Sequence, residues 1–196
     1  MRNLIVLMNI SLDGVMQSPA GCDEDTRGDF IFGGWALPYH AMMYIHPSGP
    51  QPNSSLLLGR RTYESFYAYW PRQPNNPISK SLDQIQKYVA STTLREPLPW
   101  RNSTLLRGDV PQAVAELKAQ AGSLSGADLL VLGSGVLAQT LMEYNLIDRY
   151  VLLIHPIVLG SGRRLFPDGG LRLCDLTLLD CKTTPNGVII ATYSAG

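Results

Sequence analysis

The segment from Asp128 to Leu141, DLLVLGSGVLAQTL, constrains the fold more than any other part of the sequence. Residues 129–132 form an uninterrupted apolar run, which is typical of a strand buried on both faces. Glycines at 133 and 135 break the run, and apolar residues then recur at three- and four-residue steps, which predicts a helix over 136–144. A strand, a glycine turn and a helix in succession direct backbone N–H groups and the positive end of a helix dipole at one spot. The segment therefore predicts an anion site.

The turn also fits the dinucleotide fingerprint G-x-G-x-x-A, here GSGVLA at 133–138. A second apolar run at 150–159 follows the helix, so a βαβ unit fits within about 30 residues. Glycine has no Cβ, so a phosphate can approach the backbone closely. A plain glycine turn between packed elements is the alternative interpretation. The cofactor-binding residues predicted at this turn are Gly133, Ser134, Gly135, Val136 and Leu137.

A second strand and glycine turn occur earlier in the chain. An apolar run at 55–58 leads into GRRT at 59–62, and a helix is predicted over 63–69 with Thr62 as its N-cap. A third strand at 87–90 ends in three hydroxyl residues at 91–93. If these strands are parallel neighbours, their ends share the sheet edge at which α/β proteins bind ligands. The cofactor-binding residues predicted here are Gly59, Arg60, Arg61, Thr62, Ser91, Thr92 and Thr93.

The arginines at 60 and 61 bear on the choice of cofactor. A guanidinium group binds phosphate through two parallel hydrogen bonds. A 2′-phosphate needs a basic partner, so the pair favours NADP over NAD. The alternative is that both arginines lie on a solvated surface.

The rest of the chain reads as further strands, helices and loops. A long loop over 17–34 is of the kind that often forms a functional lid. The turn signal PNG at 185–187 predicts a C-terminal hairpin. The further predicted strands are 4–12, 104–106, 176–182 and 188–194, and the further predicted helices are 35–46 and one that begins at Asp109 and runs to about 120.

Composition excludes several classes of protein. Sixteen basic residues balance sixteen acidic ones, so no overall positive charge argues for nucleic acid or anionic lipid as a partner. No apolar run approaches the roughly 18 residues of a membrane span, and the first apolar run favours a strand over a signal peptide. Three widely spaced cysteines indicate free thiols in a reducing cytoplasm. The three histidines lack metal-ligand spacing, so no metal site is expected.

Taken together, four segments resemble the dihydrofolate-reductase-like superfamily. LLLGRRTYE at 56–64 is similar to the family segment that grips the phosphate end of NADPH, and KYVAST at 87–92 is similar to the strand that follows it. The turn at 129–141 is similar to the family's pyrophosphate turn, and 149–167 is similar to its next strand. Within the superfamily, SLDG at 11–14 and GSGRRLF at 160–166 resemble the bacterial group related to the riboflavin-biosynthesis reductase domain, RibD C-terminal.

This resemblance implies one α/β domain over 1–196. The implied fold is a mostly parallel central sheet flanked by helices, with a C-terminal antiparallel hairpin. It implies hydride transfer from NADPH, with the nicotinamide against the first strand near Val15, to a pyrimidine like 5-amino-6-(5-phosphoribosylamino)uracil or to a pterin. It also implies a homodimer, with the apolar strand 150–158 as its seam. The catalytic residues expected from it are Asn9, Ser11 and Asp13.

One departure from the folate enzymes is informative. Those enzymes carry an acid on their first helix, whereas GGWALPYHAMM at 33–43 contains no carboxylate. The proton donor therefore stays open among Asp13, Asp29 and the Tyr39-His40 pair. A nucleotide-binding module without turnover is the alternative function, and a Rossmann dehydrogenase is disfavoured because only one strand and a hairpin follow the glycine turn.

Overall fold

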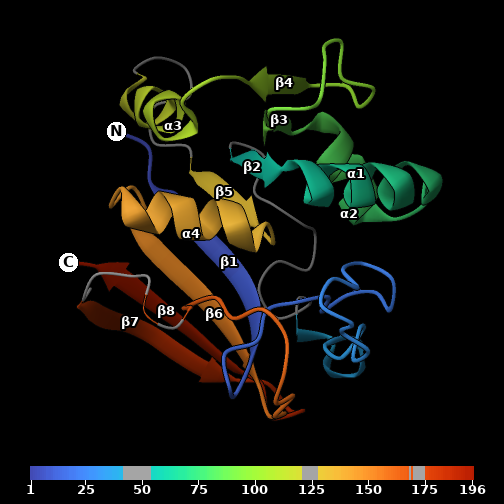
Figure 1. Ribbon diagram of the computed structural model, residues 1–196, viewed down its shortest axis with the longest axis vertical. Helices are drawn as coiled ribbons and strands as arrows, with labels where there is room; N and C mark the ends of the chain where they lie inside the picture. Colours follow the sequence, from blue (N-terminus) through green and yellow to red (C-terminus); the bar gives the residue numbers. More distant parts are fainter. Residues whose placement is uncertain (42–53, 121–127, 168, 170–174) are drawn as a thin grey trace. The chain divides into compact units, whose positions relative to one another are not determined.

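The computed structural model describes residues 1–41, 54–120, 128–167, 169 and 175–196. Within these residues, eight strands form one sheet in the order β4-β3-β2-β5-β1-β6-β8-β7 (Figure 1). The chain divides into two compact units, residues 1–5 with 46–148 and residues 6–45 with 149–196. The predicted fold class, a mostly parallel α/β sheet that ends in an antiparallel hairpin, is confirmed.

The first unit is built on parallel strands. β2 (Ser55–Gly59) lies between β3 (Gln86–Ala90) and β5 (Leu129–Leu132), and β4 (Ser103–Leu106) pairs with the outer side of β3. The leucines at 56–58 have no exposed surface, which explains why β2 has no polar alternation. The expectation that β2, β3 and β5 are parallel neighbours is confirmed, so the turns that follow them share one edge of the unit.

Four α-helices accompany these strands in the described part of the first unit. They are α1 (Arg60–Tyr69), α2 (Pro77–Gln84), α3 (Val110–Ala119) and α4 (Gly135–Glu143). As predicted, the Asp109 side chain caps α3, accepting from the N–H of Gln112 at 3.0 Å. The Asn76 side chain caps α2 in the same way, at 2.9 Å from the N–H of Ile78. The sequence interpretation did not predict α2, because proline and asparagine residues at 71–77 indicate a loop.

The second unit contains the antiparallel part of the sheet. β6 (Arg149–His155) pairs with β8 (Ile189–Ala195), which pairs with β7 (Leu176–Thr183). Gly187 has φ +81°, a conformation that glycine adopts readily in the predicted hairpin turn. β1 (Leu4–Ser11) is buried at every position except Asn9.

Three local predictions were wrong. Thr62 does not cap α1, because the helix already begins at Arg60 with Gly59 as its N-cap. The strand predicted to reach 159 ends at His155, where Pro156 removes the next backbone donor. The helix predicted over 35–46 is a single 3-10 turn, η1 (Leu37–Tyr39), ended by His40 at φ +48°, and positions 42–46 lie outside the described residues.

Two cysteines, Cys22 and Cys181, are free and exposed, and Cys174 lies outside the described residues. Within the described ranges, no helix is both long enough and apolar enough to span a bilayer.

Candidate functional site

Two glycine turns meet at the carboxyl edge of the first unit. One joins β2 to α1 at Gly59, and the other joins β5 to α4 at Gly133 and Ser134. Gly133 and Ser134 have φ of +59° and +60°, so both adopt the left-handed conformation that is rare for a residue with a Cβ. The chain therefore reverses direction tightly at the predicted pyrophosphate turn.

The Ser134 side chain ties these two turns together. Its Oγ accepts from the backbone N–H of Gly59 at 2.8 Å and donates to Oγ1 of Thr62 at 2.8 Å. A Cβ at position 59 would lie 3.4 Å from Cβ and Oγ of Ser134, so glycine permits this close approach. Ser134 and Thr62, predicted as cofactor ligands, thus also set the geometry of the edge.

The helices that begin at this edge have no side-chain cap. Gly59, the N-cap of α1, has no side chain, and the side chain of Ser134, the N-cap of α4, makes no capping hydrogen bond. By contrast, α2 and α3 are capped by Asn76 and Asp109. The starts of α1 and α4 are therefore not capped by their own N-cap side chains, and helix N-termini favour anions. Two uncapped helix starts on one edge are the geometry that a pair of phosphate groups requires.

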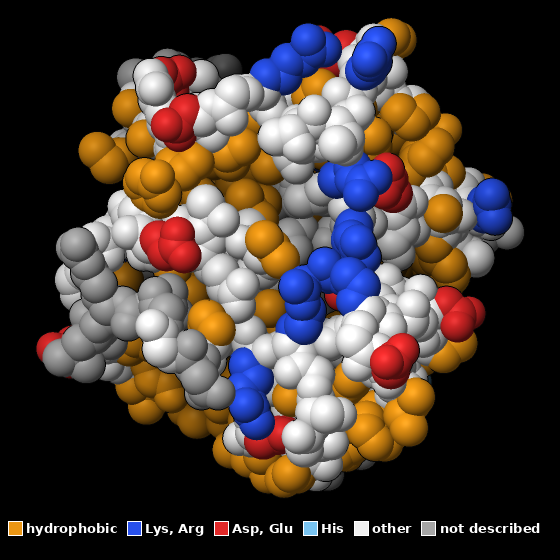
Figure 2. Space-filling view, viewed as in Figure 1, with side chains coloured by type: hydrophobic (Ala, Val, Ile, Leu, Met, Phe, Trp, Pro, Cys, Tyr) orange, Lys and Arg blue, Asp and Glu red, His pale blue; other side chains and the backbone are white. Residues whose placement is uncertain are grey.

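Basic and hydroxyl side chains accompany these helix starts. Arg60 and Arg61 occupy the first turn of α1 and are exposed, and Arg60 forms a 3.6 Å ion pair with Glu64 one turn later. At the end of β3, Ser91 Oγ accepts from the N–H groups of Thr93 at 3.2 Å and Leu94 at 3.0 Å. Figure 2 shows Lys and Arg side chains, in blue, on the face of the molecule that it draws.

Two further predicted cofactor residues lie on α4. Val136 is 54% exposed, whereas Leu137 is 8% exposed and packs into the core. The structure thus brings the glycine turns, the arginines and the hydroxyl residues together in the first unit. Their roles as cofactor ligands remain predictions.

The predicted catalytic residues belong to the second unit. Asp13 accepts hydrogen bonds from Ser11 Oγ at 2.6 Å and from the N–H groups of Leu159 at 3.1 Å and Gly160 at 2.8 Å. Partial burial acts to raise the pKa of Asp13, but these hydrogen bonds outweigh it and lower the pKa to about 2. A carboxylate that is ionised throughout the neutral range holds no proton to donate. Asp13 is therefore better suited to anchoring the loop at 159–160 than to donating a proton.

Ser11 and Val15 close the turn that follows β1. Ser11 Oγ accepts from the N–H of Val15 at 2.9 Å, and Val15 is fully buried. Val15 packs in a cluster with Phe30, Trp35 and Ala36. The side chain of Val15 therefore supports the loop from within, and its backbone N–H and carbonyl are both hydrogen-bonded to Ser11.

Gln17 connects the loop over 17–34 to the rest of the second unit. Its Nε2 donates to the carbonyls of Asp25 at 3.0 Å and Arg27 at 2.8 Å, and its Oε1 accepts from the N–H of Arg163 at 2.9 Å. The Gln17 carbonyl accepts from Trp35 Nε1 at 2.7 Å. The loop predicted as a lid is thus bonded at several points to its own unit.

Sequence interpretation gave His155 no role, and the structure places it beside Asn9. Its Nε2 lies 2.9 Å from Asn9 Oδ1, and burial lowers the pKa of His155 to about 4. The signal in the sequence was a histidine at the end of an otherwise apolar strand. Asp29 and His40 are exposed. In the described ranges, no three His, Cys, Asp or Glu residues cluster in a way that could hold a metal ion.

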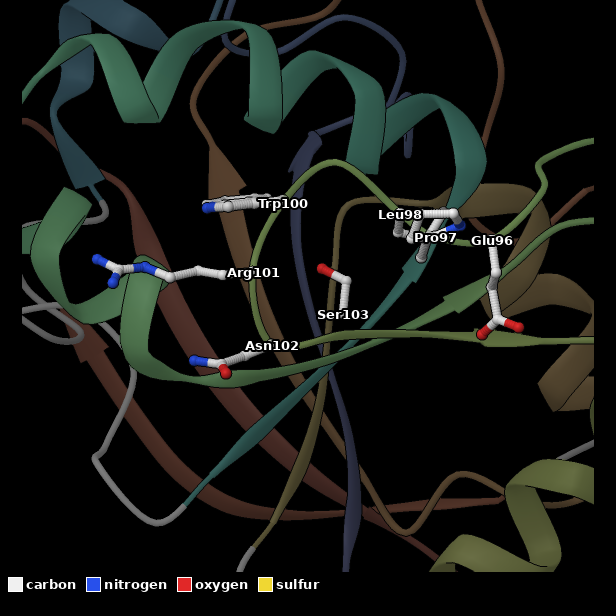
Figure 3. A pocket seen from close by; sticks show the side chains of 7 residues that line it. All are labelled: Glu96, Pro97, Leu98, Trp100, Arg101, Asn102 and Ser103. Atoms are coloured by element: carbon white, nitrogen blue, oxygen red, sulfur yellow. The ribbon is translucent and has the colours of Figure 1, made fainter.

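A pocket of about 500 Å³ lies elsewhere in the first unit, along the loop before β4. Figure 3 shows Ser103 between Glu96 and Arg101, with Trp100 nearby. Ser103 pairs with Lys87, three residues before the end of β3, so it lies roughly 10 Å from the carboxyl edge along the strands. The pocket also extends towards that edge, because Glu96, which lines it, accepts from the N–H of Leu105 at 3.5 Å, one residue before the end of β4.

Trp100 beside this pocket covers a buried lysine. Lys87 Nζ lies 4.5 Å from the centre of the Trp100 ring and donates to the carbonyls of Leu82 at 2.6 Å and Ile85 at 2.8 Å. Burial lowers the pKa of Lys87 to about 8. The lysine satisfies carbonyls at the end of α2, which is a structural role.

The sheet order and the terminal hairpin define the class of protein, a dihydrofolate-reductase-like α/β fold. Over 99% of its length the chain is similar to dihydrofolate reductase from Enterococcus faecalis complexed with NADP(H) and RAB-propyl, with a TM-score of 0.61, 14% identity and 96% of that chain covered. A pyrimidine reductase-like protein from Corynebacterium diphtheriae gives a TM-score of 0.59 and 12% identity, with 100% of this chain and 92% of that one covered.

The chain belongs to the RibD C-terminal domain family, whose model matches residues 2–190. It is similar to a putative riboflavin biosynthesis protein from Shewanella sp. PV-4, with a TM-score of 0.64, 23% identity and 99% of both chains covered. It is also 28% identical over 143 residues to the uncharacterized protein YyaP of Bacillus subtilis (strain 168), covering 71% of this chain and 72% of that protein. Membership of the RibD C-terminal domain family supports oxidoreductase as the general class of activity.

Proposed function

We propose that the protein is an NADPH-dependent reductase of a small heterocyclic substrate. The observation that carries this proposal is the carboxyl edge of the first unit. There α1 and α4 begin without side-chain caps at two glycine turns joined by Ser134. The same edge presents Arg60 and Arg61. Uncapped N–H groups beside guanidinium groups fit the phosphates of a dinucleotide.

Each group at this edge has a part in binding. The N–H groups at the start of α4 and the Gly133 turn would hold the pyrophosphate, and Arg60 or Arg61 would hold the 2′-phosphate together with the hydroxyl residues at 91–93. When bound, NADPH supplies the hydride. The chain positions the rings and excludes water, while the cofactor provides the chemistry.

The substrate class follows from the family and from what the sequence lacks. The family suggests a pyrimidine like 5-amino-6-(5-phosphoribosylamino)uracil or a pterin. The segment at 33–43 carries no carboxylate to protonate a pterin in the manner of the folate enzymes. We therefore favour the pyrimidine. Asp13 would anchor the loop at 159–160 beside the reacting groups.

The deciding experiment compares dissociation constants for NADPH and NADH by calorimetry at one salt concentration. Charged hydrogen bonds to the 2′-phosphate predict tighter NADPH binding by about 1–3 kcal/mol. Arg60→Ala and Arg61→Ala should reduce this preference. Arg149→Ala, which removes an exposed arginine at the start of β6, should leave it unchanged. Equal affinities for NADPH and NADH would refute the 2′-phosphate assignment.

A binding module without turnover is the second candidate. The low pKa of Asp13 and the absence of an acid at 33–43 favour it, because neither segment stores a proton at neutral pH. The two functions differ in one assay. A reductase oxidises NADPH in the presence of a pyrimidine or pterin substrate, whereas a binding module binds NADPH and leaves its absorbance at 340 nm unchanged.

We also propose a homodimer in the cytoplasm, with neither nucleic acid nor membrane as a partner. The seam predicted at 150–158 was wrong for most of its length, because β6 lies between β1 and β8 and buries Tyr150, Leu152 and Leu153 within the chain. β7 offers a better surface, since it ends the sheet and leaves Leu178 and Leu179 half exposed. Sedimentation showing only monomer at micromolar protein would contradict the dimer.

A further inference from the structure

His155 is a buried polar group that the proposed function has not used. It is the last residue of β6 and has no exposed surface. The rings of Trp35 and Tyr39 meet it edge-on, each with its centre 5.1 Å away. Burying an imidazole costs free energy unless it is hydrogen-bonded, so its bond to Asn9 is the interaction that holds its orientation.

The direction of that bond follows from the atoms involved. Asn9 Oδ1 is an amide oxygen and can only accept, so His155 donates from Nε2 across 2.9 Å. Nδ1 of His155 is buried without a hydrogen-bond partner among the described residues, as fits a ring nitrogen that carries no proton. The lowered pKa agrees with a neutral ring.

A fixed oxygen also fixes the other half of the Asn9 amide. The carboxamide is planar, with its oxygen and NH₂ group on opposite branches. The oxygen is held by His155, and Asn9 is the one partly exposed residue of β1, so its NH₂ group is the half left for a ligand.

We propose that His155 is a positioning residue that presents the Asn9 NH₂ group as a hydrogen-bond donor to a carbonyl oxygen on a planar ring. This inference rests on the proposed function and deepens it. A donor at this position selects a ring that shows C=O and rejects one that shows an amino group there. The carbonyl belongs either to the substrate, as in a uracil ring, or to the carboxamide of nicotinamide.

The first test concerns the histidine itself. With ¹⁵N-labelled histidine, the ring shifts of His155 should report the neutral form protonated on Nε2 at pH 7. Asn9→Leu should alter these shifts, because it removes the acceptor. A proton on Nδ1 would overturn the proposal, since Asn9 would then turn its NH₂ group toward His155 and its oxygen toward the ligand.

The second test measures binding by calorimetry. The probes are NADP⁺, 2′,5′-ADP, which lacks nicotinamide, and 5-aminouracil with and without NADP⁺. Asn9→Asp and Asn9→Leu should weaken the carbonyl-bearing probe roughly 2- to 10-fold, the range for one neutral hydrogen bond. Neither substitution should change the affinity for 2′,5′-ADP. Asn75→Asp, an exposed loop position, controls for the added charge.

Further variants separate positioning from packing. His155→Phe keeps an aromatic ring but removes the hydrogen-bond donor, so it should reproduce part of the loss of affinity seen in the Asn9 variants. His155→Gln restores a donor and should recover affinity. A merely structural role predicts no such recovery.

The arms of the binding test identify the source of the carbonyl. Weaker NADP⁺ binding alone assigns it to nicotinamide, and weaker 5-aminouracil binding alone assigns it to the substrate. Unchanged affinity for both overturns the proposal. If the wild type binds neither NADP⁺ nor 2′,5′-ADP, the proposed function fails, and the 5-aminouracil titration without cofactor still decides the role of Asn9. Absence of binding there as well overturns both.

Discussion

Replacing His155 with leucine should change how the stability of the protein depends on pH. In the folded protein, burial lowers the pKa of His155 from the ordinary 6.5 to about 4. As the pH falls below 6.5, the unfolded chain takes up a proton at this position while the folded chain does not. The unfolded state is therefore favoured, and stability is lost progressively between pH 6.5 and about 4.

The size of this effect follows from the difference in pKa. A difference of about 2.5 pH units (6.5 less 4), at 1.36 kcal/mol for each unit, gives a loss of roughly 3 kcal/mol between pH 7 and pH 4. Asp13 acts in a separate window. Its pKa is lowered to about 2, so its contribution is present above pH 3.8 and lost only as the pH falls toward 2.

The assay is urea unfolding followed by tryptophan fluorescence at half-unit steps from pH 7 to pH 4.5. The difference in unfolding free energy between wild type and His155→Leu cancels the titration of every other group. The wild type should lose stability relative to the variant as the pH falls. If the plots of unfolding free energy against pH are parallel for the two proteins, the conclusion that His155 is buried and neutral is refuted, whatever the offset between the plots.

Three further substitutions test the packing and the turns. Gln17→Leu removes three side-chain hydrogen bonds and should destabilise the fold by about 2–4 kcal/mol in urea unfolding, whereas little change would show that solvent replaces them. Gly162 has φ +111°, and Gly162→Ala places a Cβ 2.7 Å from the Phe30 ring. It should lower the melting temperature more than Gly160→Ala, because Gly160 has φ +74° and no neighbour within 4 Å of an added Cβ. Equal changes in melting temperature would show that the clash relaxes. Gly133→Val at φ +59° should weaken NADPH binding by more than its stability loss explains, and normal binding by the folded variant would reduce the site to an ordinary turn.

The predictable parts of the molecule were those set by local pattern. Uninterrupted apolar runs identified β2 and β5 as buried neighbours, and glycine after each run identified the turns that share an edge. Asp109 identified the start of α3 because a cap acts within three residues. These features depend on residues close together in the chain, so sequence spacing is enough to find them.

What escaped prediction depends on partners far apart in the chain. From sequence alone, Asp13 is one of several candidate proton donors, because the two N–H groups that hold it come from 146 and 147 residues away. The hydrogen bond between Asn9 and His155 joins residues 146 positions apart, and the one between Gly59 and Ser134 joins residues 75 positions apart. No periodicity encodes such contacts. They appear only when the fold places the side chains together.

The hydrogen bonds of Gln17 have a consequence for how a ligand would be received. A flexible loop must give up conformational entropy each time it closes over a ligand, which lowers affinity. Here that entropy is lost once, during folding, because a buried amide already bonds the carbonyls of Asp25 and Arg27 and the N–H of Arg163. The loop thus behaves as a preassembled wall, and a ligand that fits it should associate without waiting for a closing step.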